Sequence, residues 1–311
     1  MNVLIIKKKT NYELFGNHLN EEVSFGVFPK DEFKKIKDSH EFHYQTLFNL
    51  YKLLDKDNIA YHEVTRETFT FSYNHANQLK GLHLPGEHTS KQTPQTYDAI
   101  ITVGGDGTLL SASQQTFDQT PIVGIKSSPT SIGYLCAYSA SDVNELVQNL
   151  KSKTYHVTSV QRLKAEIIFI HDIGVVETPP VLNDFLFTNI HPAAISKYRL
   201  SIGSLSEDQR SSGLWISTPA GSTAAIAATG GKRQPLASMD FQYSVRERYQ
   251  IDTQDPLLTQ GFFNPDRDRF EVENRSELAI LALDGQHGIA YLTYGDRIIL
   301  RRATPLNLMV K

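Results

Sequence analysis

The chain has 311 residues and a mass of 35.0 kDa, enough for about two domains. Hydrophobic residues make up 40% and charged residues 21%, and the formal net charge is −3, which excludes a disordered chain and a basic nucleic-acid binder. The one cysteine, Cys136, excludes an internal disulfide framework and a cysteine-rich metal centre. Because no apolar run is long enough to span a bilayer, we expect a cytoplasmic protein without a membrane or nucleic-acid partner.

Strand-like and helix-like segments alternate over the first 152 residues. The apolar run Val3–Ile6 predicts a buried strand, and a helical stripe follows, formed by Tyr44, Leu47, Phe48, Tyr51 and Leu54. Residues 74–96 have the composition of a surface loop, in which we expect His75, His83 and His88 to be solvated rather than to bind a metal. Two further strands, Ala99–Val103 and Pro121–Ile125, precede a helix with Val143, Leu146, Val147 and Leu150 on one face. Ser139 and Asp142 have capping-box spacing before that helix.

This alternation predicts a Rossmann-like α/β domain over residues 1–152. Beyond it, short strand-like runs separated by turn residues dominate, with one helical stretch at Ala224–Thr229. These runs are 166–170, 184–188, 197–202, 213–217, 278–283 and 297–300. They predict a β-rich domain over residues 153–295, built as a β-sandwich or a second antiparallel sheet.

The sharpest motif is the glycine-rich turn Gly104-Gly105-Asp106-Gly107-Thr108, which ends a buried strand and can begin a helix. Glycines allow backbone N–H groups to approach phosphate oxygens, and a helix N-terminus favours their charge. Asp106 suits either a proton acceptor or a magnesium ligand, but it could equally be only a cap for the turn. The chain contains neither G-x-x-x-x-G-K-[ST] nor G-x-G-x-x-G after a strand, so a P-loop NTPase and an ordinary dinucleotide-dependent dehydrogenase are not supported.

Three later segments have both a structural and a binding interpretation. Asn183-Asp184 could be a simple turn or could bind a ribose diol, and Thr218–Thr223 could be a helix cap or a polar wall that includes Ser222. Asp284-Gly285 lies between two apolar runs and is interpreted first as a hairpin turn, with a site role second. Lys7–Lys9, at the end of the first strand, is interpreted as a solvated edge.

The chain resembles the NAD kinases, whose ordered motifs match GGDGT, LNDFLFTN, WISTPAGSTAA, ATGG, LALDGQ and YGDRIILRR. Among these segments, TPAGSTA discriminates best against other kinases that contain GGDGT. The resemblance implies that residues 296–311 return toward the first domain and that the active site lies in a cleft between the domains. It also implies roles for individual residues. Asp106 matches the general base. The phosphate-donor loop corresponds to Gly104, Gly105, Gly107 and Thr108. The dinucleotide-binding positions correspond to Asn183, Asp184, Ser222, Thr223, Ala224 and, as a secondary role, Asp284.

The chain also departs from the typical pattern of this family. Ser212 replaces a carboxylate that helps to hold NAD, Ala225 replaces a frequent tyrosine, and Lys126 replaces a frequent asparagine. KSSPTSIGYLC and RSSGL resemble the divergent, mitochondrial-type members. These departures weaken the NAD-pocket assignments more than that of Asp106.

By this resemblance we expect Mg²⁺-dependent transfer of the γ-phosphate of ATP, or of a phosphate from polyphosphate, to the 2′-hydroxyl of the adenosine ribose of NAD. No protein ligands for the metal are predicted, and a homodimer or homotetramer is expected. Two alternatives stay open at this point. The first is a lipid or other small-molecule kinase that shares GGDGT, and the second is a non-catalytic dinucleotide-binding regulator.

Overall fold

The computed structural model describes residues 1–66, 82–83, 96–128, 133–170, 174–249 and 257–311. The helices are α1 (Asn11–Ser24), α2 (Lys30–Lys56), α3 (Asp106–Gln114) and α4 (Val143–Ser152), with short 3₁₀ segments η2 (Ala140–Asp142), η3 (Ala220–Thr223) and η4 (Ala225–Thr229). The strands are β1 (Asn2–Lys7), β2 (Ala60–Thr65), β3 (Leu82–His83), β4 (Ala99–Gly104), β5 (Ile122–Lys126), β6 (Tyr138–Ser139), β7 (His156–Phe169), β8 (Gly174–Glu177), β9 (Asp184–Asn189), β10 (Ser196–Ile202), β11 (Leu205–Ser211), β12 (Gly213–Ser217), β13 (Phe241–Arg246), β14 (Gln260–Phe263), β15 (Phe270–Asn274), β16 (Leu278–Leu283), β17 (Gly288–Thr293) and β18 (Arg297–Val310).

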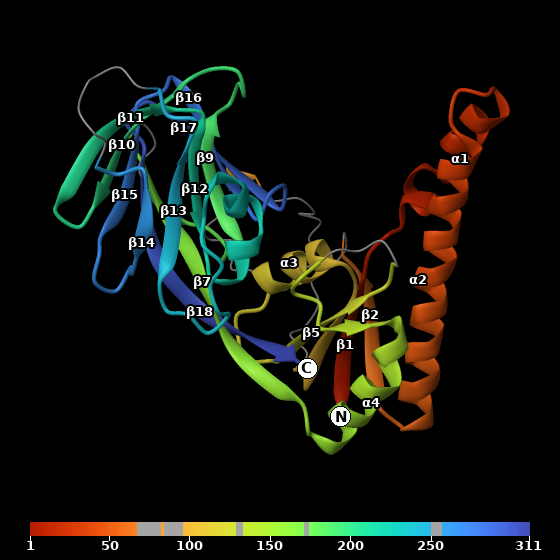
Figure 1. Ribbon diagram of the computed structural model, residues 1–311. Helices are drawn as coiled ribbons and strands as arrows, with labels where there is room; N and C mark the ends of the chain where they lie inside the picture. Colours follow the sequence, from red (N-terminus) through yellow and green to blue (C-terminus); the bar gives the residue numbers. More distant parts are fainter. Residues whose placement is uncertain (67–81, 84–95, 129–132, 171–173, 250–256) are drawn as a thin grey trace.

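The first part of the chain forms parallel strands in the spatial order β5-β4-β1-β2 (Figure 1). Helices α2 and α4 pack on one face of these strands, where Val3 and Ile5 meet Leu47 and Leu50. Helix α3 covers the other face. Because β2 lies on one side of β1 and β4 on the other, the order of the strands reverses between β1 and β4. Ligands of open α/β sheets bind outside the carboxyl ends of the strands at such a point.

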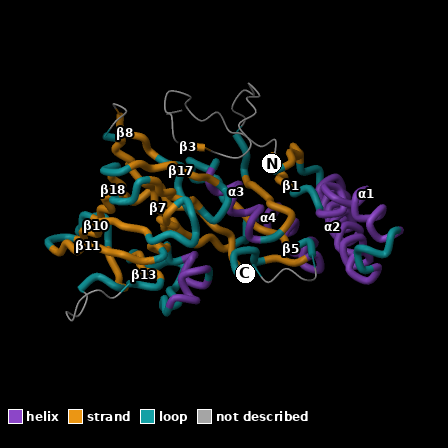
Figure 2. Tube along the Cα trace, turned by 90° about the horizontal axis from the view of Figure 1, so that it is seen from above, coloured by secondary structure: helices purple, strands orange, loops and turns teal. Residues whose placement is uncertain are grey.

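The second part of the chain is dominated by strands and lies at the opposite end of the molecule from α1 and α2 (Figure 2). An antiparallel sheet has the order β14-β13-β12-β9-β16-β17-β3. It packs against strands of the mixed sheet, which continues from β5 through β18 to β15, β10 and β11. The largest core cluster lies between these two sheets and includes Phe185, Phe187, Tyr198 and Phe270.

The structure confirms the predicted fold class, an α/β part followed by a β-rich part. It corrects several element bounds. β7 and β18 each have 14 residues and pair along most of their length, whereas the sequence indicated only short strands at 166–170 and 297–300. At the C-terminal end, Leu308 of β18 pairs with Ile122 of β5. The proposed division at residues 152/153 and 295/296 remains a prediction.

Most of the predicted loop 74–96, with His75 and His88, lies outside the described residues. Within it, Leu82–His83 forms β3, which pairs with β17, so this dipeptide is a strand rather than a loop. The capping box at Ser139 and Asp142 is confirmed, and it caps the 3₁₀ turn that leads into α4. No helix in the described part of the chain is long and apolar enough to cross a membrane.

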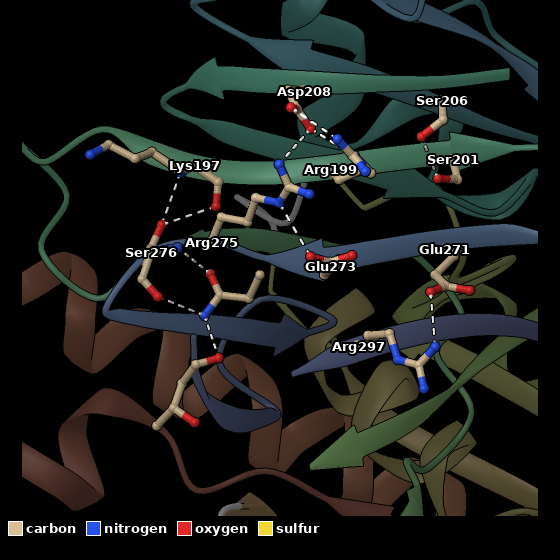
Figure 3. Close-up of polar contacts among 12 residues, drawn as sticks. Lys197, Arg199, Ser201, Ser206, Asp208, Glu271, Glu273, Arg275, Ser276 and Arg297 are labelled. Carbon is tan, nitrogen blue, oxygen red and sulfur yellow. Dashed lines mark hydrogen bonds and ion pairs between the residues drawn. The ribbon is translucent and has the colours of Figure 1, made fainter. Parts of the chain in front are cut away.

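The mixed sheet has an ion-pair ladder on β10, β11 and β15 (Figure 3). Asp208 accepts hydrogen bonds from Arg199 at 2.8 Å and Arg275 at 2.9 Å, and Arg275 also pairs with Glu273 at 3.2 Å. Exposed pairs of this kind contribute at most about 1 kcal/mol each to stability. Each of these two surface arginines therefore has a carboxylate partner.

Candidate active site

The predicted glycine-rich turn joins the end of β4 to the start of α3. A Cβ on Gly104 would overlap the side chain of Thr108, so the close approach of the helix to the strand requires glycine there. Thr108 is buried with its side chain over Gly104, and its backbone N–H donates to the carbonyl of Gly105 at 2.9 Å. Gly105 and Gly107 are half-buried. The turn therefore lies at the carboxyl edge of the parallel strands, next to the point where their order reverses.

Asp106 is the first residue of α3 and is half-buried. Its carboxylate accepts hydrogen bonds from the N–H groups of Tyr134 at 2.7 Å, Leu135 at 3.1 Å and Cys136 at 3.2 Å. A Cβ on Gly133 would overlap the same carboxylate. Asp106 thus ties the start of α3 to the segment after β5, and its oxygens are oriented by backbone N–H donors.

The Leu182–Asp184 segment is held through its backbone from two sides. On one side, Asp284 accepts from the N–H groups of Leu182 at 3.1 Å, Asn183 at 2.7 Å and Asp184 at 3.2 Å. On the other side, Thr218 donates its N–H to the Asn183 carbonyl at 2.9 Å and its hydroxyl to the Leu182 carbonyl. The three predicted motifs around Asn183, Thr218 and Asp284 therefore meet in space, although they lie up to 102 residues apart.

The side chains of Asn183 and Asp184 have no hydrogen-bond partner among the residues that the structure describes. Asp184 is only 4% exposed. Burial, together with the charge of Asp284, raises the pKa of the Asp184 carboxyl to about 7. A buried carboxyl group without a partner is unfavourable, so it is a candidate for binding a polar ligand.

Asp284 lies in the turn between β16 and β17 with a φ of 45° and is 5% exposed. Besides the three backbone N–H groups, it accepts a hydrogen bond from the Gln114 amide at 3.1 Å. Burial raises the pKa of the Asp284 carboxyl to about 6, although the N–H donors act in the opposite sense and lower it. Since Asp284 has four N–H partners and Asp184 has none, Asp184 is the carboxyl of this pair that keeps its proton to the higher pH. The hairpin-turn interpretation of Asp284 is borne out, and its carboxylate contacts protein groups.

Helix α3 joins the two halves of the site. Asp106 is its first residue and Gln114 its last, eight residues later, a distance of about 12 Å along the helix axis. Gln114 binds Asp284, and Arg162 of β7 donates to the carbonyls of Ser113 and Thr116 at the same end. Figure 1 shows α3 between the parallel strands and the β-rich part. The helix therefore sets the separation between the glycine-rich turn and the Asn183–Asp184 segment.

The 3₁₀ segment η3 contains Ser222 and Thr223 of the predicted polar wall, and Ala224 follows it directly. Ser222 is buried, donates to the Pro219 carbonyl at 2.7 Å and accepts from the Gln234 N–H at 3.0 Å, so its hydroxyl serves the loop itself. Thr223 and Ala224 are half-buried, and Ala225 is exposed. A Cβ on Gly221 would overlap the carbonyl of Asn183. This loop therefore packs directly against the Asn183–Asp184 segment.

Two residues near the site were missed by the sequence analysis. His287, three residues after Asp284, places its Nε2 atom 3.9 Å from the position of a Cβ on Gly107. Burial and the charge of Arg66 lower the pKa of His287 to about 4, so its imidazole is neutral at pH 7. Its position next to DGQ could have drawn attention to it. Arg162 is fully buried and gave no local signal, because its partners lie at remote positions of the chain.

Known protein families and proteins are similar to this chain over a large part of its length. Residues 31–155 match the ATP-NAD kinase N-terminal domain. NADH kinase from Arabidopsis thaliana is 32% identical over 251 residues, covering 67% of this chain and 71% of that protein. The chain belongs to the NAD kinase family. A probable NADH kinase from Oryza sativa subsp. japonica is 29% identical over 231 residues, covering 67% of this chain and 69% of its own length.

Solved structures of NAD kinases share the fold. The crystal structure of yeast NADH kinase complexed with NADH has a TM-score of 0.64 at 14% identity, covering 100% of this chain and 84% of that one. An NAD kinase from Archaeoglobus fulgidus in complex with ATP has a TM-score of 0.63 at 16% identity, covering 99% and 93%. The protein is therefore a kinase with the NAD kinase fold, and its relatives include proteins named NAD kinase and proteins named NADH kinase.

Proposed function

We propose that the protein transfers the γ-phosphate of ATP to the 2′-hydroxyl of the adenosine ribose of NAD, giving NADP. The observation that carries this proposal is the Asn183–Asp184 segment, whose backbone groups are bonded to Asp284 and Thr218 while its two polar side chains have no described partner. A carboxyl group that keeps its proton to about pH 7 both donates and accepts hydrogen bonds, as an amide does. This pair therefore suits the hydroxyl groups and nitrogen atoms of an adenosine.

The acceptor side and the donor side are linked through α3. Phosphoryl transfer depends mainly on positioning and on charge neutralisation. A helix whose first residue belongs to the glycine-rich turn and whose last residue binds Asp284 supports such positioning. In the proposed roles, Gly104, Gly105, Gly107 and Thr108 shape the donor loop, and Ser222, Thr223 and Ala224 support the acceptor side.

Asp106 is proposed as the proton acceptor. The ribose oxygen forms a bond to the γ-phosphorus while the bond from that phosphorus to the β,γ-bridging oxygen breaks, ADP leaves, and the hydroxyl proton passes to the Asp106 carboxylate. Since both carboxylate oxygens accept backbone N–H groups, one of these hydrogen bonds must weaken as the proton arrives. The segment after Gly133 is thus part of the proposed reaction.

Magnesium fits the proposal as part of the substrate. The described residues contain no group of three or more His, Cys, Asp or Glu side chains that could hold a metal ion. Mg²⁺ usually binds through substrate phosphates with few protein ligands, and it would neutralise phosphate charge here. Polyphosphate could replace ATP as donor, and a homodimer or homotetramer in the cytoplasm remains a prediction.

NADH is a second candidate acceptor. Two curated relatives carry the name NADH kinase or probable NADH kinase, and a similar structure contains NADH. NAD and NADH have the same adenosine ribose, so the proposed acceptor residues suit both dinucleotides. Parallel assays with the two substrates at saturating ATP decide which one has the higher kcat/KM.

The test of the proposal is Asp106→Asn, with Asp98→Asn as the matched control. Asp98 is exposed and lies just before β4, at the other end of the same strand. We expect Asp106→Asn to lower kcat for NADP formation by ~10²–10⁴, because a positioned general base contributes about that factor. The melting temperature should also fall, because the new NH₂ group faces a backbone N–H donor. Asp98→Asn should retain full activity. A role in anchoring alone would lower the melting temperature but leave kcat near its original value, which would overturn the proposed role of Asp106.

A further inference from the structure

Three cations lie in one row across the carboxyl ends of the parallel strands. The register pairs Thr65 with Lys7, Lys7 with Val103, and Gly104 with Lys126. The next residue on β2 is Arg66 and the next on β1 is Lys8, so the row reads Arg66, Lys8, Gly104, Lys126. Two hydrogen bonds fix this arrangement, from the Lys8 N–H to the Val103 carbonyl at 3.4 Å and from the Arg66 N–H to the Lys7 carbonyl at 2.7 Å. We call Arg66, Lys8 and Lys126 the cation row.

The cation row lies on the face of the sheet that α3 covers. Alternate residues of a strand point to opposite faces, and Leu4, Ile6 and Val64 contact the core cluster that contains Leu109 of α3. Lys8 is two residues after Ile6, and Arg66 is two residues after Val64, so both lie on this same face. On β4, the Cβ direction of Gly104 leads to Thr108 of α3, and Lys126 is its neighbour on β5. The N-terminus of α3 therefore lies over Gly104, between cations on both sides.

The lysines of this row have no carboxylate partner in the part of the chain that the structure describes. Lys8 is half-buried, and burial together with the charge of Arg66 lowers its pKa. Lys126 is also half-buried, and its charge lowers the pKa of the Cys136 thiol, which burial and the charge of Asp106 raise. By contrast, Arg199 and Arg275 in Figure 3 each bind a carboxylate. Two lysines held beside the glycine-rich turn without a carboxylate partner favour binding of an anion.

We propose that the cation row binds the condensed phosphate chain of the phosphate donor, with Lys8 and Lys126 as direct contacts. This inference rests on the proposed kinase function and adds the residues that neutralise the donor. Neighbouring strands are ~4.8 Å apart, so the backbones of Lys8 and Lys126 are ~10 Å apart on either side of Gly104. Flexible lysine side chains reach phosphates from that separation, while the N–H groups of the turn face the same chain. Either a nucleoside triphosphate or inorganic polyphosphate has the required chemistry.

Binding measurements on Lys8→Gln and Lys126→Asn test this proposal, with Lys9→Gln as the control. Lys9 is exposed and follows Lys8 directly. Calorimetry with a non-hydrolysable ATP analogue should show about tenfold weaker binding for each of the first two variants, and an unchanged Kd for Lys9→Gln. The melting temperature without ligand should stay the same or rise in Lys8→Gln, because repulsion from Arg66 is relieved. A structural role for Lys8 would lower it.

Inorganic tripolyphosphate distinguishes the two sources of the phosphate chain. If it displaces the ATP analogue and the variants weaken both ligands equally, the row binds the phosphate chain itself. If tripolyphosphate does not bind, yet the variants weaken the ATP analogue, the row serves a nucleotide donor. Unchanged analogue binding in both lysine variants overturns the inference even if NADP is formed. Weakened binding without any NADP formation sustains the inference and refutes the proposed function instead.

Discussion

Replacing Asp284 by asparagine tests whether this buried carboxylate positions the acceptor segment. Asp284 accepts four hydrogen bonds at 2.7–3.2 Å, two to each oxygen. An asparagine keeps one acceptor oxygen for Asn183 and Asp184 and places an NH₂ group opposite the Leu182 N–H and the Gln114 amide. Gln114 can rotate to present its own oxygen, but the Leu182 N–H loses its partner.

One buried donor without a partner costs about 1–3 kcal/mol, so we expect a decrease of that size in the free energy of unfolding, measured with urea. The same change loosens the backbone of Asn183 and Asp184. If about 1 kcal/mol of this positioning is lost from substrate binding, KM for the dinucleotide rises at least about fivefold. Steady-state kinetics at saturating ATP measure it, and kcat should change less than KM.

Asp296→Asn is the matched control. Asp296 is also buried in a turn between strands, and it accepts hydrogen bonds from the Thr293 N–H at 2.7 Å and the Ile170 N–H at 3.0 Å. Its removal should reduce stability by a similar amount and leave KM unchanged, because Thr293 lies at the other end of β17 from Asp284. Equal KM values in the two variants would refute the positioning role of Asp284. An unchanged stability in Asp284→Asn would refute the hydrogen-bond argument.

Three further changes test other parts of the site. Gly221→Ala introduces a Cβ that overlaps the Asn183 carbonyl, so KM for the dinucleotide should rise about tenfold or more, and an unchanged KM contradicts this contact. The Asp184 carboxyl has a raised pKa of about 7, so its contribution to stability is present below about pH 4 and is lost as the pH rises through 7. Urea unfolding of Asp184→Asn should therefore show a stability relative to the original chain that increases from pH 5 to 8, and a constant difference contradicts this. Arg162→Met removes a buried guanidinium that donates to the carbonyls of Ser113, Thr116 and Thr304, the first two of these bonds being buried. It should lower the unfolding free energy by about 3 kcal/mol, whereas a loss below about 1 kcal/mol contradicts the role of these bonds.

Local patterns in the sequence predicted the parts of the fold that depend on neighbouring residues. The β-branched run at Val3–Ile6 and the capping box at Ser139 are both present in the structure. Helix α1 was missed, although Thr10 and Glu13 form a capping box at its start that the sequence could have shown. β18 continues to Val310, well beyond the predicted run 297–300, and it contains Pro305. The structure accommodates it where the pairing with β7 shifts register, between Ala303 and Leu306.

Features that depend on contacts between distant segments could not be predicted in the same way. The motifs around Asn183, Thr218 and Asp284 were identified, but only the three-dimensional structure shows that two of them bind the backbone of the first. Lys8 was expected at a solvated edge, yet it is half-buried, because its environment depends on the strand order β5-β4-β1-β2 and on α3. A single sequence does not contain that order in any local pattern.

The position of the new phosphate on the product tests the central claim most directly. The protein is incubated with NAD, ATP and Mg²⁺, and the product is analysed by phosphorus and proton NMR. The account predicts a phosphate monoester on the 2′-carbon of the adenosine ribose, formed in a 1:1 ratio with ADP. A monoester at any other hydroxyl group, or hydrolysis of ATP without a phosphorylated dinucleotide, would contradict it.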